Sequence, residues 1–304
     1  MTTVKIAAVQ MVSTPDVARN LEAAGALMAR AAAAGAALVS LPEYFCLLGR
    51  RDTDKLAAAE APGTGPIQRF LADAAKRHGV FIVGGTLPVR APASGPREGS
   101  GAAPHVLNRC CVFTPACTEA AHYDKIHLFA FDNGRESYDE GRTLAAGSEP
   151  VAVDLALPGW GDAAGQAAAA PLRLGLSVCY DLRFPELYRA LMHPPCDLVA
   201  VPSAFTHTTG QAHWEVLLRA RAVENQCYVI AAAQGGLHEN GRRTFGHSIV
   251  VDPWGEVLAC RREEGEGVVL AEIDAARLAA VRRQLPALAH RRLGAVGPFS
   301  AAGA

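Results

Sequence analysis

The sequence lacks the features that mark three large classes of protein. Lysine and arginine number 29 against 30 acidic residues, a net charge of −1, so nothing indicates the clustered positive charge of a nucleic-acid-binding protein. No apolar run reaches the roughly 18–20 residues that a membrane-spanning helix needs. The N-terminal stretch MTTVKIAAVQMV lacks the charged and long apolar regions of a secretory signal. We therefore expect a soluble, cytoplasmic protein with no nucleic-acid or membrane partner.

Paired cysteines at zinc-binding spacing are also missing. Of eight cysteines, Cys110, Cys111 and Cys117 come closest to a cluster, with His122 and His127 nearby. The C-x₂₋₄-C spacing of zinc sites is absent from this cluster. Cys110 and Cys111 are adjacent in the apolar run VLNRCCVF, so in a strand they face opposite sides. We expect free thiols in a reducing compartment and no metal site.

What the sequence does contain is an alternation of strand and helix patterns. Val4 to Met11 reads as a strand, and Thr14-Pro15 offers an N-cap and a first-turn proline for an Ala-rich helix that ends near Ala34. A second apolar run, AALVSLPEYF, completes a β-α-β unit, which is typical of an α/β sheet. No break divides the later alternation, so we expect one domain over residues 1–304, with a tail of the last residues after Arg292.

Cys179 ends the apolar strand LRLGLSV, and a helix is expected to begin at Pro185. A thiol at a strand-to-helix turn can project into solvent with backbone N–H groups aimed at the same point. A helix N-terminus nearby would lower the pKa of the thiol and favour the thiolate. The alternative is a buried structural cysteine, which is the commoner fate of a free thiol.

Two charged residues stand in apolar surroundings. Glu43 follows a strand in LPEYF, where burial would raise the pKa of its carboxyl group, as suits a general base. Lys125 lies in the predicted strand EAAHYDKIHLF, where an ammonium group needs an anion, either a carboxylate or a developing oxyanion. The structural alternatives are a salt-bridged Glu43 and an edge-strand Lys125 that faces water.

Histidine is the usual base for a nucleophilic cysteine, and ten histidines are present. His127, His207, His213 and His247 fit strand or helix positions with local hydrogen bonds. Nothing in their spacing pairs one of them with Cys179, so residue patterns alone leave a Cys–His hydrolase open.

The segments LPEYF, YDKIHLF and GLSVCYDLRFPELYRAL resemble the three catalytic motifs of the nitrilase superfamily, in the family's order. The resemblance extends from Val4 to about Arg292. It implies an α/β fold of the four-layer α-β-β-α sandwich type and one carbon–nitrogen hydrolase domain. It also implies a Glu–Lys–Cys triad that needs no metal or organic cofactor.

The resemblance gives these residues roles. Glu43 would be the general base, Lys125 the oxyanion-stabilising cation and general acid, and Cys179 the nucleophile that forms a thioester. A second glutamate that supports the lysine would be Glu140, with Glu136 as the competing position.

The C-terminal half, including PSAFTHTTGQAHWEVLLRARAVENQ and GHSIVVDPWGEVLA, resembles the deaminated glutathione amidase branch. Related enzymes hold the keto-acid end of the substrate with residues that match Arg183, Phe205 and Thr209, and the Tyr180 backbone N–H would help to bind the oxyanion. A guanidinium fork suits a carboxylate. Arg183 could instead pair with Asp181 or Glu186.

The function that the resemblance implies is hydrolysis of deaminated glutathione to 2-oxoglutarate and cysteinylglycine, a metabolite-repair reaction on a small-molecule amide. The alternatives are an ω-amidase acting on 2-oxoglutaramate, another small-amide or carbamoyl hydrolase, and a non-catalytic scaffold of the same fold. By analogy with the family, a homodimer or larger homo-oligomer is expected.

Overall fold

The structure, a computed structural model, describes residues 3–91, 106–134, 137–161 and 170–293. Strands in these ranges form two main sheets, one of eight and one of six strands. The first sheet has the order β18 (Gly267–Asp274), β1 (Thr3–Gln10), β2 (Leu38–Ser40), β3 (Phe81–Val83), β5 (Val106–Phe113) and β4 (Leu87–Arg90), and β6 (Glu119–Asp124) and β9 (Leu144–Ala145) also pair with β5.

The second sheet has the order β10 (Val151–Leu155), β11 (Leu172–Leu176), β12 (Leu198–Ala200), β13 (Tyr228–Ala231), β16 (Ile249–Val251) and β17 (Val257–Cys260). Two separate ribbons are formed by β7 (Ala130–Asp132) with β8 (Ser137–Asp139) and by β14 (Gly235–Leu237) with β15 (Arg243–Phe245). The helices are α1 (Val17–Ala33), α2 (Asp54–Ala57), α3 (Pro66–His78), α4 (Pro185–Ala190), α5 (His207–Asn225) and α6 (Ala275–Gln284), with 3₁₀ turns η1 (Glu140–Arg142) and η2 (Cys179–Arg183).

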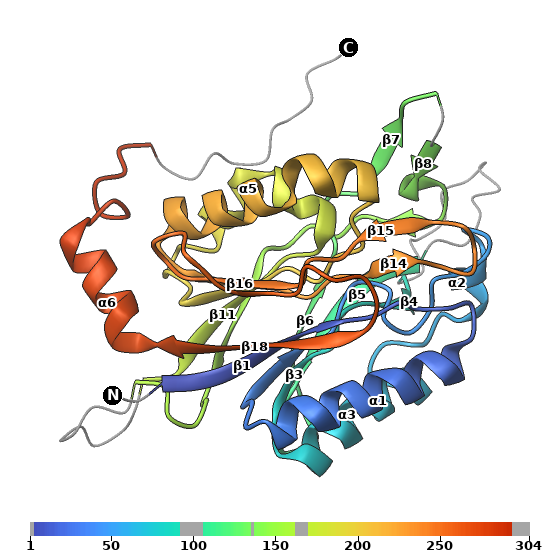
Figure 1. The fold of residues 1–304 in the computed structure, drawn as a ribbon, viewed down its shortest axis with the longest axis horizontal. Coiled ribbons are helices and arrows are strands. Elements are labelled where there is room, and N and C mark those ends of the chain that lie inside the picture. Colours follow the sequence, from blue (N-terminus) through green and yellow to red (C-terminus); the bar gives the residue numbers. More distant parts are fainter. Residues whose placement is uncertain (1–2, 92–105, 135–136, 162–169, 294–304) are drawn as a thin grey trace.

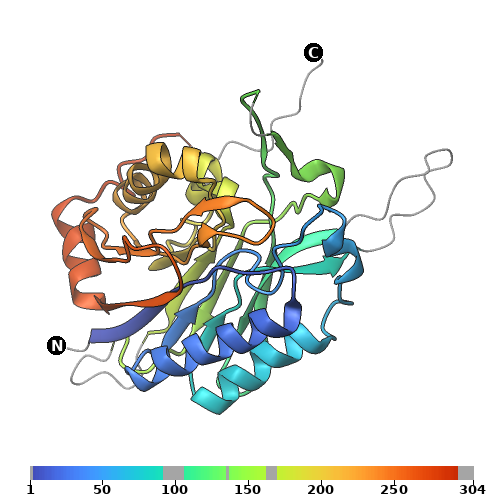
Figure 2. The same cartoon turned by 45° about the vertical axis from the view of Figure 1, so that its right-hand side comes forward.

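The elements stack in four layers, α-β-β-α, as predicted. Figures 1 and 2 show α1 and α3 on the outer face of the first sheet and α5 on the outer face of the second. Alternation along β1 explains this stacking, because Ile6 belongs to the core between the two sheets whereas Ala7 belongs to the core under α1 and α3. Cys110 and Cys111 divide between the same two cores, so their opposite orientation is confirmed.

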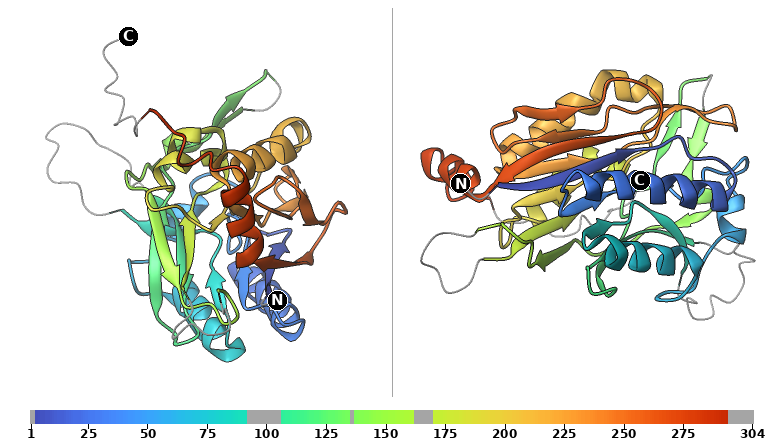
Figure 3. Two further views of the ribbon diagram at one scale, coloured as in Figure 1. Left: turned by 90° about the vertical axis from the view of Figure 1, so that its left-hand side faces the viewer. Right: turned by 60° about the horizontal axis from the view of Figure 1, so that its bottom comes forward.

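Parallel pairing within each sheet brings the ends of key strands to one place. β2 runs parallel to β1 and β3, and β11 runs parallel to β12, which runs parallel to β13. Ligand sites in such sheets lie beyond the carboxyl ends of the strands. The first and the last strands of the described chain are neighbours in the first sheet, where β18 lies antiparallel beside β1 (Figures 1 and 3).

The predicted cap of the first helix was wrong by two residues. Asp16, rather than Thr14, caps α1, and its carboxylate accepts hydrogen bonds from the N–H groups of Ala18 and Arg19 at 2.9 and 3.2 Å. Aspartate ranks above threonine as an N-cap. The Thr14 hydroxyl instead accepts a hydrogen bond from the Asp16 N–H at 3.1 Å.

The strand β6 is shorter than the sequence predicted. The strand expected through Lys125 ends at Asp124. Helix α5 begins at His207, and Thr206 caps it. The antiparallel pairing of β16 with β17 forms a hairpin that turns at residues 252–255.

The structure does not test three of the predictions. Most of the expected C-terminal tail and the competing Glu136 lie outside the described residues, and the single-domain assignment stays a prediction. Among the described helices, none combines the length and the apolar character that crossing a membrane requires.

Candidate active site

Glu43 lies just beyond the carboxyl end of β2, which is the position that the sequence predicted. Its side chain is only 1% exposed and accepts a hydrogen bond from Asn108 Nδ2 at 2.9 Å. The next residue, Tyr44, has a φ of +57°, and its N–H donates to Thr86 Oγ1 at 2.8 Å. Gln234 Nε2 holds the Glu43 carbonyl at 3.0 Å. The turn is therefore fixed on both sides of Glu43, which aims the carboxylate inward.

Lys125 immediately follows β6 and is fully buried. Its backbone N–H donates to the Asn108 carbonyl at 3.1 Å, which continues the pairing of β5 with β6 by one residue. The ammonium Nζ lies 2.9 Å from Glu43 Oε1 and 2.7 Å from Glu140 Oε2. The water-facing alternative for Lys125 is therefore wrong. Two carboxylates compensate the cost of burying this charge.

Glu140 is the second glutamate that contacts Lys125 in this structure. Its carboxylate also accepts hydrogen bonds from the Tyr44 hydroxyl at 2.6 Å and from the Phe129 N–H at 2.7 Å. Three donors from three segments therefore hold Glu140 in place. The sequence identified Glu140 only through the resemblance, with Glu136 competing.

Cys179 begins the turn η2, three residues beyond the end of the strand β11. Its φ is +49°, a left-handed backbone conformation that residues other than glycine rarely adopt. Its N–H donates to the Pro202 carbonyl at 2.9 Å. Backbone strain of this kind costs about 1–3 kcal/mol and persists only where surrounding contacts impose it. The turn places the thiol at the base of a pocket that Glu43 and Glu140 also line.

Asp181 is one of the contacts that hold this turn. The carboxylate is completely buried and accepts hydrogen bonds from the Val178 N–H and the Tyr123 hydroxyl, both at 2.8 Å. It also accepts from the His127 N–H at 3.0 Å and lies 2.7 Å from His127 Nδ1. Asp181 thus ties η2 to the end of β6, two residues from Lys125. His127 contacts Asp181 and stacks on Phe184, and no hydrogen bond among the described residues joins it to Cys179.

The electrostatics of the site oppose one sequence expectation and confirm another. Burial, followed by the charge of Glu43, raises the pKa of the Cys179 thiol well above its usual value, despite the opposing effect of Lys125. The expected lowering of that pKa by a helix N-terminus was therefore wrong, because desolvation outweighs it. Burial likewise raises the pKa of Glu43, although Lys125 and a hydrogen bond from Cys179 lower it. A neutral thiol beside a basic carboxylate is an arrangement for proton transfer.

Lys125 remains a cation in this environment. Burial by itself lowers the pKa of its ammonium group, but the charges of Glu140 and Glu43 outweigh burial and raise the pKa overall. The same ion pair with Lys125, together with hydrogen bonds from Phe129 and Tyr44, outweighs burial at Glu140 and lowers the pKa of that carboxyl group. Two of the three N–H donors of Lys125 are used by these carboxylates, so one is left for a further acceptor.

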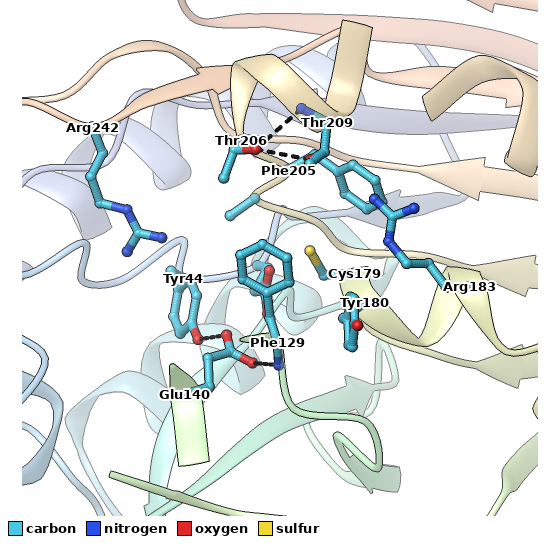
Figure 4. Close-up of a pocket in the computed structure, with 12 residues that line it drawn as sticks. Tyr44, Phe129, Glu140, Cys179, Tyr180, Arg183, Phe205, Thr206, Thr209 and Arg242 are labelled. Carbon is cyan, nitrogen blue, oxygen red and sulfur yellow. Dashed lines mark hydrogen bonds between the residues drawn. The ribbon is translucent and has the colours of Figure 1, made fainter. Parts of the chain in front are cut away.

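The remaining predicted residues line the pocket around Cys179, as Figure 4 shows: Tyr180, Arg183, Phe205 and Thr209. Arg183 lies over the rings of Phe205 and Tyr180, at 5.4 and 5.8 Å from their centres, and contacts His213 Nδ1 at 3.2 Å. Within the described ranges no carboxylate lies within ion-pair distance of Arg183, so the suggested pairing with Asp181 or Glu186 is not formed. The Thr209 hydroxyl lies 2.9 Å from that of Thr206.

Sequence reasoning missed four residues that shape the site. Tyr44, Phe129 and Arg242 line the pocket, and Asn108 orients Glu43. Asn108 carried a signal, because a buried amide in the apolar run VLNRCCVF needs hydrogen-bond partners. Arg242 carried none, since it lies in a turn about 60 residues beyond Cys179. Among the described residues no three His, Cys, Asp or Glu side chains converge as a metal site.

Several known proteins are similar to this chain in sequence or in fold. The sequence profile of the carbon–nitrogen hydrolase family matches residues 5–283. The deaminated glutathione amidase of Synechocystis sp. is 42% identical over 94% of this chain and 97% of its own. The human omega-amidase is 35% identical over 96% of both chains. A crystal structure of a mutant amidase from Nesterenkonia sp., which carries an acetamide moiety covalently added at its active-site cysteine, superposes with a TM-score of 0.73 at 25% identity, covering 95% of this chain and 94% of that one.

Proposed function

The chain belongs to the carbon–nitrogen hydrolase family, and we propose that it hydrolyses deaminated glutathione to 2-oxoglutarate and cysteinylglycine. The observation that carries this proposal is Cys179 beside the buried Glu43–Lys125 pair, in a pocket where Arg183 has no carboxylate partner among the described residues. The relative at 42% identity, named deaminated glutathione amidase, supports the choice of substrate.

In the first step Glu43 takes the thiol proton and Cys179 attacks the amide carbonyl. The raised pKa values of both groups support a proton transfer that is coupled to attack, rather than a thiolate formed beforehand. The third N–H of Lys125 and the backbone N–H of Tyr180 stabilise the oxyanion. Tyr180 lies in the first turn of η2, where N–H groups have no acceptor within the helix.

The tetrahedral intermediate then expels the amine. The proton held by Glu43 passes to the departing nitrogen as the C–N bond breaks, which leaves a thioester on Cys179. The resemblance assigned the general-acid role to Lys125, but its raised pKa makes that ammonium a poor proton donor. We therefore propose Glu43 as the acid for this step and Lys125 as a fixed positive charge.

Water completes the cycle. Glu43, ionised again, takes a proton from a water molecule that attacks the thioester carbonyl. The second tetrahedral intermediate releases the acid product, and the Cys179 sulfur recovers its proton from Glu43. Residues of this site and one water molecule carry out every step, and none is routed through a cofactor.

The acyl end of the substrate is held by residues that line the pocket around Cys179. Arg183 binds the α-keto carboxylate through its fork, the face of Phe205 packs on the short aliphatic stem, and the Thr209 hydroxyl hydrogen-bonds a polar oxygen of the keto acid. The contact of Arg183 with the Phe205 ring supports this grouping. A substrate without the carboxylate would leave the guanidinium without its partner.

An ω-amidase is the second candidate, favoured by the human relative of that name at 35% identity. The test is a side-by-side measurement of kcat/KM on deaminated glutathione, 2-oxoglutaramate and butyramide. The proposal expects that order of preference. Faster turnover of 2-oxoglutaramate would make this an ω-amidase, and equal rates on butyramide would reject a keto-acid substrate. The cytoplasmic location and the homo-oligomer stay predictions.

A further inference from the structure

The pocket contains a second arginine that the mechanism leaves unused. Arg242 comes from the turn between β14 and β15 and lines the same pocket as Cys179 and Arg183. Figure 4 shows the two arginines on opposite sides of the thiol, with Tyr44 on the side of Arg242. In the described part of the chain, no carboxylate lies within ion-pair distance of Arg242.

Contacts on the face of the guanidinium and on the backbone fix the position of Arg242. Its guanidinium stacks over the ring of Tyr138, 4.6 Å from the ring centre. Its backbone N–H donates to Asn240 Oδ1 at 3.0 Å, and Asn240 Nδ2 donates in turn to the Gly49 carbonyl at 2.7 Å. Face stacking leaves the N–H groups at the guanidinium edge free to form paired hydrogen bonds. The neighbouring Arg243 differs, since it pairs with Glu264 at 2.5 Å.

The chemistry of the proposed substrate calls for such a group. Deaminated glutathione carries one carboxylate on the keto-acid side of the scissile amide and another at the end of the departing dipeptide. Two extended residues span about 7 Å, so the second carboxylate lies far from Arg183 and meets another part of the wall. 2-Oxoglutaramate releases ammonia and has no such group.

We propose that Arg242 binds the terminal carboxylate of the leaving peptide, so that the pocket selects keto-acid amides whose amine side is a short peptide with a free C-terminus. This assignment rests on the function proposed above. Arg183 and Arg242 then hold the two ends of the substrate, and the amide bond between them lies over Cys179. Arg242 is a specificity residue and takes no part in the bond changes.

The test compares wild type and Arg242→Gln on three substrates: deaminated glutathione, the same molecule with its terminal carboxylate converted to a carboxamide, and 2-oxoglutaramate. Wild type should prefer the carboxylate over the carboxamide by about 10- to 100-fold in kcat/KM, the range for a charge-assisted hydrogen-bond pair. Arg242→Gln should reduce this preference to about twofold or less. The loss on deaminated glutathione should exceed the loss on 2-oxoglutaramate at least tenfold.

Arg243→Gln is the matched control, because it removes the same charge from the adjacent position outside the pocket, and it should keep the wild-type preference. Equal losses on all three substrates in Arg242→Gln, or no preference for the carboxylate in wild type, would overturn the assignment. The assignment would also be overturned if a substitution of Arg183, rather than of Arg242, abolished the preference in kcat/KM for the terminal carboxylate over the carboxamide. Wild type that fails on deaminated glutathione but cleaves 2-oxoglutaramate rejects the proposed function itself, a result separable from a failure at Arg242 alone.

Discussion

The two sheets contribute different kinds of residue to the pocket. Segments of the first sheet supply Glu43, Lys125 and Glu140. Lys125 pairs with the two carboxylates at 2.9 and 2.7 Å, and all three side chains are largely buried. Segments after the strands of the second sheet supply Arg183 and Thr209, which face the pocket. Groups that pair with each other can fix charges and move protons, whereas groups that face the pocket can choose a ligand. Cys179 follows a strand of the second sheet, and in the proposed mechanism it exchanges its proton with Glu43 of the first.

This contrast predicts that substitutions in the first group slow every amide alike, whereas substitutions in the second change which amide is preferred.

The largest effect is expected where the two groups meet. Cys179→Ala removes the nucleophile and should lower kcat by roughly 10⁶-fold, the scale found when a hydrolase loses its nucleophile. Cys227→Ala, which removes another buried thiol outside the pocket, should retain turnover. Steady-state assays on deaminated glutathione measure both. Activity that survives in Cys179→Ala would end the covalent mechanism.

Glu43→Gln should lower kcat by about 10²–10⁴-fold on every amide, because the base is lost. Burial and then the Glu43 charge raise the pKa of the thiol, so removing that charge should lower the thiol pKa, while Lys125 stays. Alkylation of Cys179 by iodoacetamide, followed against pH by mass spectrometry, should therefore rise at lower pH in the variant than in wild type. A thiol pKa that moves upward would contradict this electrostatic account.

In wild type, kcat/KM should fall as pH drops through a pKa above the usual 4.5 of glutamate, since the base must be ionised and its pKa is raised. This acid limb should disappear in Glu43→Gln.

Lys125→Met leaves Glu43 and Glu140 buried together without their cation. Turnover should fall by about 10²–10³-fold on all amides, and stability by about 3–5 kcal/mol. Urea unfolding and kinetics separate the two effects. Arg282→Met, which breaks an ion pair with Asp197 away from the pocket, should reduce stability and spare kcat. If Lys125→Met lowered turnover of only one substrate, residues of the first sheet would also select the substrate, contrary to the contrast drawn above.

Arg183→Lys tests the second group, because it keeps the charge and removes the planar fork. We expect kcat/KM to fall about 10- to 100-fold on both keto-acid amides, since one charge-assisted hydrogen bond is worth about 1.5–3 kcal/mol. The rate on butyramide should stay as in wild type. Unchanged rates on both keto acids would make Arg183 a structural residue.

The smallest effect is expected for Thr209→Val, which removes one neutral hydrogen bond, worth about 0.5–1.5 kcal/mol. The resulting loss of about two- to tenfold in kcat/KM should fall on keto-acid substrates and leave butyramide unaffected. If kcat/KM fell as much on butyramide as on the keto acids, the role of Thr209 would be structural: its contact with Thr206 would only support α5.

The sequence by itself determined the alternation of strands and helices and the positions of Glu43 and Cys179 beyond strand ends, because apolar runs and their breaks are local patterns. Local patterns also placed Cys110 and Cys111 on opposite faces. Family motifs supplied the roles of Lys125 and Glu140, which no local pattern distinguished from surface charges.

Only the tertiary structure decided the electrostatics and the far wall of the pocket. Lys125 is buried and paired because segments separated by 82 and 15 residues bring their carboxylates to it. The pKa of Cys179 follows from desolvation by the whole site, which the flanking residues do not contain. Arg242 reaches the pocket through a turn distant in sequence, since convergence of remote segments leaves no signal in the spacing of residues along the chain.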